Sequence, residues 1–236
     1  MLELHYGDKG AGPVRTSGRT AILTAVLVVA AGTVAPAFSG TAASAGTAAL
    51  ASTAVPPSFT VAVDGALDQV VVDRSGHAFA TNPARNEVEV LSVATGKLDA
   101  PIVVGSSPAG LDLSPDEATL YVADAQSNDI SVVDVAQRRQ VRRIALPPAP
   151  NGGQPLSIAV AANGTALVTR TASGGTSEGV PTLSIDLANG TVRERRDWDY
   201  TSSAGDRSVV KASGDRSRIA IVREPGPGQP GVAAFY

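Results

Sequence analysis

The chain has 236 residues with 19 basic and 22 acidic side chains, and its formal net charge of −3 excludes a strongly basic nucleic-acid-binding protein on bulk charge. Its 17% of charged and 43% of hydrophobic residues are typical of a folded protein and exclude a disordered polyelectrolyte. Cysteine is absent and histidine occurs twice, which excludes disulfides, thiolate sites and a multi-histidine metal site within one chain.

The N-terminus carries the pattern of an export signal. Three basic side chains within the first 19 residues precede an apolar run over residues 21–31, and Ala-x-Ala patterns follow. Extended to Ala35, the apolar stretch has about 15 residues and is still shorter than the roughly 20 that a membrane-spanning helix needs. We therefore predict a signal peptide over residues 1–37, cleaved after Ala37 or Ala45; the alternative is an uncleaved membrane anchor.

Residues 38–57 are almost entirely Ala, Ser, Thr and Gly. Such a segment has little large apolar surface to bury, so we predict a flexible leader between the signal and the folded part. Together the two segments predict a secreted or extracytoplasmic protein associated with the cell surface.

The rest of the chain contains an internal sequence repeat of about 42 residues. At an offset of 42, residues 79–82 fall on residues 121–124, and residues 86–90 fall on residues 128–132. A third, interrupted copy begins near Gln154. A fourth copy begins near Ser208.

Each repeat contains four short apolar stretches that alternate with turn residues. In the second copy these stretches are predicted strands at 110–113, 119–123, 129–134 and 141–146. Units of 40–45 residues with four antiparallel strands are typical of β-propeller blades. The fold class is thus predicted as all-β, a β-propeller over residues 58–236 with about four blades, at approximately 65–104, 105–147, 154–198 and 205–236.

The second repeat carries a family resemblance. Residues 108–116, 120–124 and 129–134 resemble the YVTN-type propeller repeat family, also described as YncE-like or lactonase-like propellers. Val168 and Ala220 stand where the motif has tyrosine, so the third and fourth copies depart from it. The resemblance implies a WD40-like propeller of about seven blades, and it carries little information on function because propellers host many activities.

Two interpretations of the blade number remain open. At an offset of 42, residues 59–63 fall on residues 101–105, a fourth strand, so the chain has the layout of a ring closed by strands from both termini. Four blades then form a closed ring, or the chain is part of a longer propeller and forms an open arc with an exposed sheet edge. The abrupt apolar end at Phe235 and Tyr236 favours the open arc.

Several motifs have structural explanations that outweigh the catalytic ones. Ser208 and Lys211 match S-x-x-K, but a strand places these two residues on opposite faces. His77 is expected to be a surface turn residue at the start of a strand. The aspartates recur at equivalent turns of the repeats, which indicates turn capping. No metal, cofactor or catalytic residue is predicted.

Arginines cluster at 138–143 and 193–196, on or beside predicted outer strands. They could meet anionic polymers, but charged outer strands also prevent edge pairing, and no aromatic residues are interleaved for base stacking.

The function expected is a binding or interaction scaffold; the alternative is a lactonase-like hydrolase, which the resemblance alone implies. The partner is expected to be a protein, an envelope polymer or a small molecule, and nucleic acid is not expected. Exposed loops on a rigid scaffold carry function in such proteins. The candidate ligand-binding residues lie around the loops between second and third strands: Asn82, Arg85, Asp124, Asn128, Arg170 and Arg223.

Overall fold

The computed structural model describes residues 20–25, 59–149, 152–171, 182–195, 207–224 and 232–235. These residues form strands and turns without an α-helix, and within them no helix is long and apolar enough to cross a membrane. Strands form because valine, isoleucine and leucine alternate with polar residues, and Gly, Asn, Asp and Ser occupy the turns between them.

The first two strands form a separate pair. β1 (Thr20–Ala25) runs antiparallel to β2 (Phe59–Asp64). β1 lies within the predicted signal peptide, so this pairing belongs to the uncleaved chain. Val61 of β2 packs against a small apolar cluster that includes Ala78 and Leu91.

The first blade-like sheet has an outer strand divided in two. β6 and β7 both pair with β5, so the outer strand is interrupted between them. The strands are β3 (Val70–Val72), β4 (His77–Asn82), β5 (Glu87–Ser92), β6 (Lys97–Leu98) and β7 (Ile102–Val103).

The second and third sheets are complete four-stranded antiparallel blades. The second has β8 (Pro108–Leu113), β9 (Thr119–Asp124), β10 (Asp129–Asp134) and β11 (Arg139–Ala145). The third has β12 (Pro155–Val160), β13 (Thr165–Arg170), β14 (Thr182–Asp186) and β15 (Thr191–Arg195). The second-blade strands agree with the predicted stretches to within two residues at each end.

The fourth sheet has three described strands in the order β16-β17-β18. They are β16 (Arg207–Ala212), β17 (Ile219–Glu224) and β18 (Val232–Phe235). Ser208 is buried and Lys211 is exposed on β16, as the strand prediction requires, so these residues do not form a serine–lysine catalytic pair.

The core is divided into apolar clusters between successive sheets. One cluster joins the first and second blades around Phe79, Val88 and Leu120, and the next joins the second and third around Ile130 and Leu183. A smaller cluster joins the third and fourth sheets. Each fully buried side chain of this size stabilises the fold by roughly 1.5–3 kcal/mol relative to exposure, so the blades are held mainly face to face.

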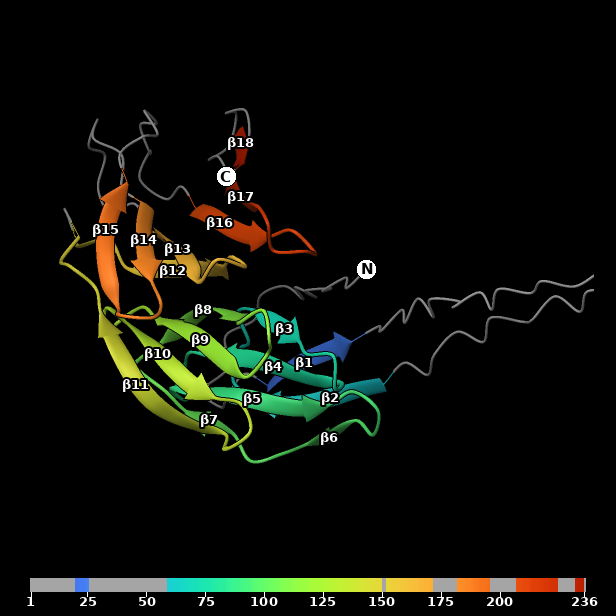
Figure 1. Ribbon diagram of the computed structural model, residues 1–236. Coiled ribbons are helices and arrows are strands. Elements are labelled where there is room, and N and C mark those ends of the chain that lie inside the picture. The colour runs from blue at the N-terminus through green and yellow to red at the C-terminus, as the bar shows by residue number, and fades with distance from the viewer. Residues whose placement is uncertain are drawn as a thin grey trace, which may run out of the picture.

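The sheets follow one another around an arc that is open between the fourth sheet and the β1-β2 pair (Figure 1). Within the described residues β2 pairs with β1 and β18 pairs with β17, so the ring is not closed by pairing β2 with β18. The predicted fold class, an all-β chain with about four propeller blades in an open arc, is confirmed.

Candidate functional site

The second strands of three successive blades end in polar residues at equivalent positions. Asn82 is the last residue of β4, Asp124 of β9 and Arg170 of β13. Their fractional exposures are 0%, 0% and 4%, so all three side chains are buried. Each lies beside the connection that leads into the first strand of its own blade, and we call this end of the blades the loop end.

In the first blade, Asn82 holds this connection through its amide. Its Nδ2 donates hydrogen bonds of 2.8 Å to the Asp64 carbonyl oxygen and to Glu89 Oε1. A Cβ atom on Gly65 would lie 2.6 Å from Asn82 Oδ1, and Gly65 has a φ of +106°, so only glycine fits there. Asn82 Oδ1 is buried without a hydrogen-bond partner.

In the second blade, Asp124 occupies the corresponding place. Ser131 Oγ donates a hydrogen bond of 2.5 Å to Asp124 Oδ2, while Oδ1 is buried and unpartnered. The Gly105 backbone N–H donates to Ser131 Oγ, which ties the connection to the same cluster. Burial raises the pKa of Asp124 to about 7, and the neighbouring Asp129 carboxylate adds to the rise, against the opposing Ser131 hydrogen bond.

Both blades therefore bury two carboxyl groups at the loop end but supply one arginine. In the first blade Arg85 pairs with Glu87, and burial raises the pKa of the neighbouring Glu89. In the second, Arg143 Nη1 lies 3.4 Å from Asp129 Oδ2. In the described part of the chain, one carboxyl group of each blade, Glu89 in the first and Asp124 in the second, thus forms no ion pair and has a raised pKa.

In the third blade, Arg170 takes the equivalent position. Its Nη2 donates to the Pro147 carbonyl oxygen and, at 3.4 Å, to Asn128 Oδ1. Its Nε and Nη1 atoms are buried and have no hydrogen-bond partner among the described residues. Burial lowers the pKa of Arg170, and Glu194 opposes this shift.

The remaining candidate residues lie nearby but differ in environment. Arg85 lies in the loop after β4, and its side chain is 47% exposed. Asn128 lies in the loop before β10 with a φ of +52°, and its Nδ2 donates to the Leu146 carbonyl oxygen. Arg223 lies in β17, and its side chain is outside the described residues. The expectation that these residues sit in exposed loops is corrected for Asn82, Asp124 and Arg170, because the connection to the first strand covers each of them.

Glu87 and Glu89 were missed by sequence reasoning, although a signal was present. They alternate with valine on β5, which predicts one solvent-facing side, whereas the structure buries both faces of this strand. Ser131 corresponds to Glu89 at the repeat offset of 42, so the repeat alignment could have located this position.

The opposite end of the blades is built from a recurring turn. In the second and fourth sheets a hydroxyl donates to a carboxylate, from Ser114 to Asp116 at 2.5 Å and from Ser213 to Asp215 at 2.6 Å, and in the third the Thr165 N–H donates to Asn163 Oδ1. In the first blade the order is reversed, with Ser75 donating to Asp73. This recurrence confirms that these aspartates cap turns.

His77 is the first residue of β4, as predicted, and its Nδ1 lies 2.8 Å from Ser75 Oγ in the same turn. Within the described residues, no group of three or more His, Asp or Glu side chains is arranged to hold a metal ion. Arg139, Arg142 and Arg143 lie on β11, an edge strand of the second sheet, and Arg138 lies in the turn before it. Arg193 and Arg195 lie on β15, whereas Arg196 lies outside the described residues.

Comparison with solved structures places the fold among propellers. The chain is similar to hydrazine synthase of Kuenenia stuttgartiensis with a TM-score of 0.55 and 23% identity, over 70% of this chain and 44% of the other. It is also similar to a catalytically inactive virginiamycin B lyase from Staphylococcus aureus with quinupristin, with a TM-score of 0.51 and 13% identity, over 75% and 59% of the two chains.

These identities establish a likeness of fold alone. The chain spans about half the length of the solved structures that it matches. No family model matches the sequence, and no curated protein matches it. The fold and the comparisons together define a β-propeller-type protein.

Proposed function

We propose that this chain is an exported propeller of the YVTN type that acts as a binding scaffold at the cell surface or outside the cell. The observation that carries the proposal is the contrast between the two ends of the blades. At the opposite end, which we call the turn end, a hydroxyl–carboxylate pair stabilises the turn in the first, second and fourth sheets, and in the third the Asn163 side chain accepts from the Thr165 N–H, as structural elements would. The loop end carries an amide, an acid and a base at equivalent positions: Asn82, Asp124 and Arg170.

A repeat that varies the buried polar group beneath each connection gives the loop end of each blade a different surface, which is suited to contacting one asymmetric partner. Loops on rigid sheets hold such groups in fixed positions and so reduce the ordering cost of binding. The exposed Arg85 and the half-buried Asn128 lie beside these positions and extend the polar set to the surface.

Export is supported by residues 1–37 and is tested by the intact mass of the native product in culture supernatant and envelope fractions. Cleavage after Ala37 removes 37 of the 236 residues, so the shortened species would establish export. The full-length mass in the cytosol alone would overturn it.

Binding is tested by sedimenting the purified full chain with insoluble envelope material of the producing cells. We expect saturable co-sedimentation at physiological salt. Failure to sediment with this material, together with rapid turnover of a lactone, would instead favour the hydrolase.

A lactonase-like hydrolase is kept as a second candidate because of Asp124. A general acid or base at neutral pH requires a carboxyl group with a raised pKa, and the pKa of Asp124 is raised to about 7. If this alternative holds, Asp124→Asn abolishes lactone hydrolysis, and Asp116→Asn at the opposite end of the blades leaves it unchanged.

A further inference from the structure

Two loop-end arginines differ in how their charge is balanced. Arg85 Nη1 lies 3.1 Å from Asp64 Oδ2, and its Nε donates to Glu87. These hydrogen bonds and charges raise the pKa of Arg85, the Glu87 contact first. Arg85 is therefore satisfied within the protein. Arg170 is buried, and no carboxylate in the described part of the chain forms an ion pair with it.

Among the described residues, Arg170 forms side-chain hydrogen bonds through its Nη2 atom alone. Nη2 donates to the carbonyl oxygen of Pro147 and to Asn128 Oδ1, and both acceptors are neutral. This bond to Pro147 corresponds to the bond that Asn82 makes to the Asp64 carbonyl oxygen in the first blade. Nη2 thus anchors the connection into the blade, and Nε and Nη1 take no part in that structural role.

A buried guanidinium group without a counter-ion is unfavourable, because its charge has lost its hydration and its N–H groups have lost their acceptors. The lowered pKa of Arg170, which burial causes, is consistent with this. Glu194 acts on it from β15 but does not reach ion-pair distance. An oxyanion is the ligand group that best matches free guanidinium donors.

We propose that Arg170 anchors a bound oxyanion, a carboxylate or phosphate group of the ligand, at the loop end of the third blade. The anion accepts hydrogen bonds from the two Arg170 nitrogens that have no acceptor in the described part of the chain, and it neutralises the buried charge. This inference rests on the proposed binding function and gives the charge class of the ligand.

The test uses thermal unfolding of the purified full chain in sodium phosphate, sodium acetate and sodium chloride at matched ionic strength. Phosphate or acetate is expected to raise the Tm by on the order of 5 °C at a hundredfold excess over Kd, and chloride is not. Acetate alone would identify a carboxylate site, and phosphate alone a phosphate site.

Two variants separate a ligand site from a structural arginine. Arg170→Met keeps the length of the side chain and is expected to abolish the oxyanion-dependent rise. Without added oxyanion its Tm should lie close to that of the wild type, because loss of the Nη2 hydrogen bond to Pro147 is offset by removal of an unpaired buried charge. Arg74→Met is the control and should keep the rise, since Arg74 already pairs with Glu117 and lies at the opposite end of the blades.

The proposal is overturned if phosphate and acetate act like chloride, or if Arg170→Met keeps the rise. A large drop in the Tm of Arg170→Met in sodium chloride, without an oxyanion effect in the wild type, would assign Arg170 a purely structural role. Envelope sedimentation distinguishes failure of the anion site from failure of the proposed binding function. If Arg170→Met sediments with envelope material like the wild type, the anion site is refuted and the scaffold proposal stands.

Discussion

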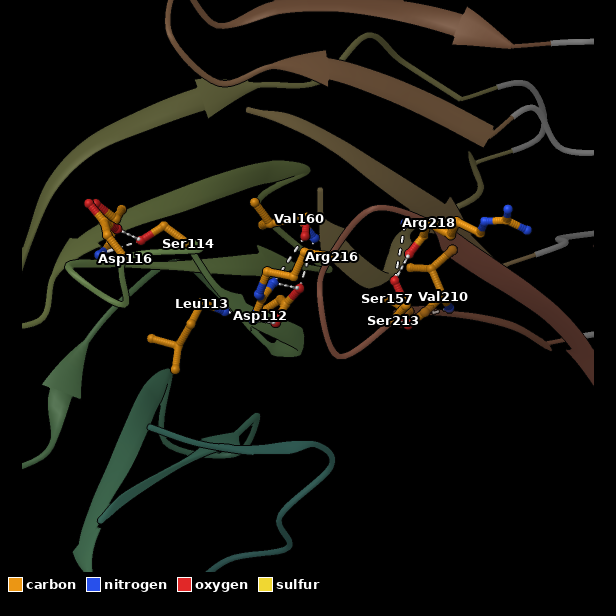
Figure 2. A network of polar contacts seen from close by, with 11 residues as sticks. Asp112, Leu113, Ser114, Asp116, Ser157, Val160, Val210, Ser213, Arg216 and Arg218 are labelled. Carbon is orange, nitrogen blue, oxygen red and sulfur yellow. Dashed lines mark hydrogen bonds and ion pairs between the residues drawn. The ribbon is translucent and has the colours of Figure 1, made fainter. Parts of the chain in front are cut away.

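The Arg216 guanidinium group reaches the Asp112 carboxylate, 104 residues earlier in the chain, with two hydrogen bonds of 2.9 and 3.1 Å (Figure 2). Arg216 lies in the turn between β16 and β17, and Asp112 lies on β8, so the pair links the fourth sheet to the second blade. Arg216 Nη1 also donates to the Val160 carbonyl oxygen, and the Val160 N–H donates to Asp112 Oδ2. One charge pair therefore ties three consecutive blades together.

Asp112→Ala is expected to lower the free energy of unfolding by about 2–4 kcal/mol, because it leaves the mostly buried Arg216 and the Val160 N–H without an acceptor. Urea unfolding measures the loss. Asp99→Ala is the matched control: Asp99 pairs with Arg138 on a more exposed surface, and its loss should stay below about 1 kcal/mol. Equal losses in the two variants would contradict a special role for the Asp112 pair.

Gly110→Ala tests the close packing of the innermost strands. A Cβ atom there would lie 2.6 Å from Ser157 Cα and 2.7 Å from the Leu156 carbonyl oxygen, both backbone atoms of the neighbouring blade. We expect destabilisation of about 3 kcal/mol, measured by urea unfolding, since the two strands must separate. Gly214→Ala, with no atom within 4 Å, should be nearly neutral, and a comparable loss there would refute the packing argument.

Asp124 predicts a pH dependence of stability. Its folded pKa of about 7 lies above the unfolded value of 3.8, so the folded state binds the proton more tightly in this interval. The free energy of unfolding should therefore fall as the pH rises from about 4 to about 7. Asp124→Asn, which copies the Asn82 of the first blade, should flatten this slope in denaturant titrations at several pH values.

The control for this prediction is Asp116→Asn. The hydrogen bond from Ser114 lowers the pKa of Asp116, so its contribution is present above the unfolded pKa and is lost only at more acidic pH. The slope between about pH 5 and pH 7 should be the same as in the wild type. If the stability of Asp124→Asn depends on pH as steeply as that of the wild type, a group other than Asp124 binds the proton.

The sequence predicts the strands well because each strand depends on local alternation and local turns. Thr119–Asp124, for example, extends the predicted stretch by a single residue. The Asn-Gly pairs at 163–164 and 189–190 are a local signal of tight hairpins, and the structure places both in turns; within each pair the glycine, Gly164 or Gly190, adopts positive φ and the asparagine does not.

The chemistry of the loop end was not predictable in the same way. Gly105 covers Asp124, and Pro147 covers Arg170. Each covering residue lies about 20 positions earlier in the chain, so local sequence does not reveal the burial. The link between Asp112 and Arg216 depends on the placement of the intervening blade, which no local pattern encodes. Polar residues after an apolar stretch look alike in sequence whether a connection covers them or solvent does.

Envelope sedimentation of two matched double variants tests the central claim, that binding resides at the loop end, most directly. Arg85→Ser/Asn128→Gly removes polar side chains from the loop end, and Arg74→Ser/Glu117→Gly removes an ion pair from the turn end. Asn128 and Glu117 both have positive φ, so glycine preserves each backbone. Arg85→Ser/Asn128→Gly is expected to bind envelope material about tenfold more weakly than the wild type or worse, a loss on the order of 1.4 kcal/mol. Arg74→Ser/Glu117→Gly is expected to bind it as tightly as the wild type. Equal affinities, or a loss confined to the turn-end variant, would contradict it.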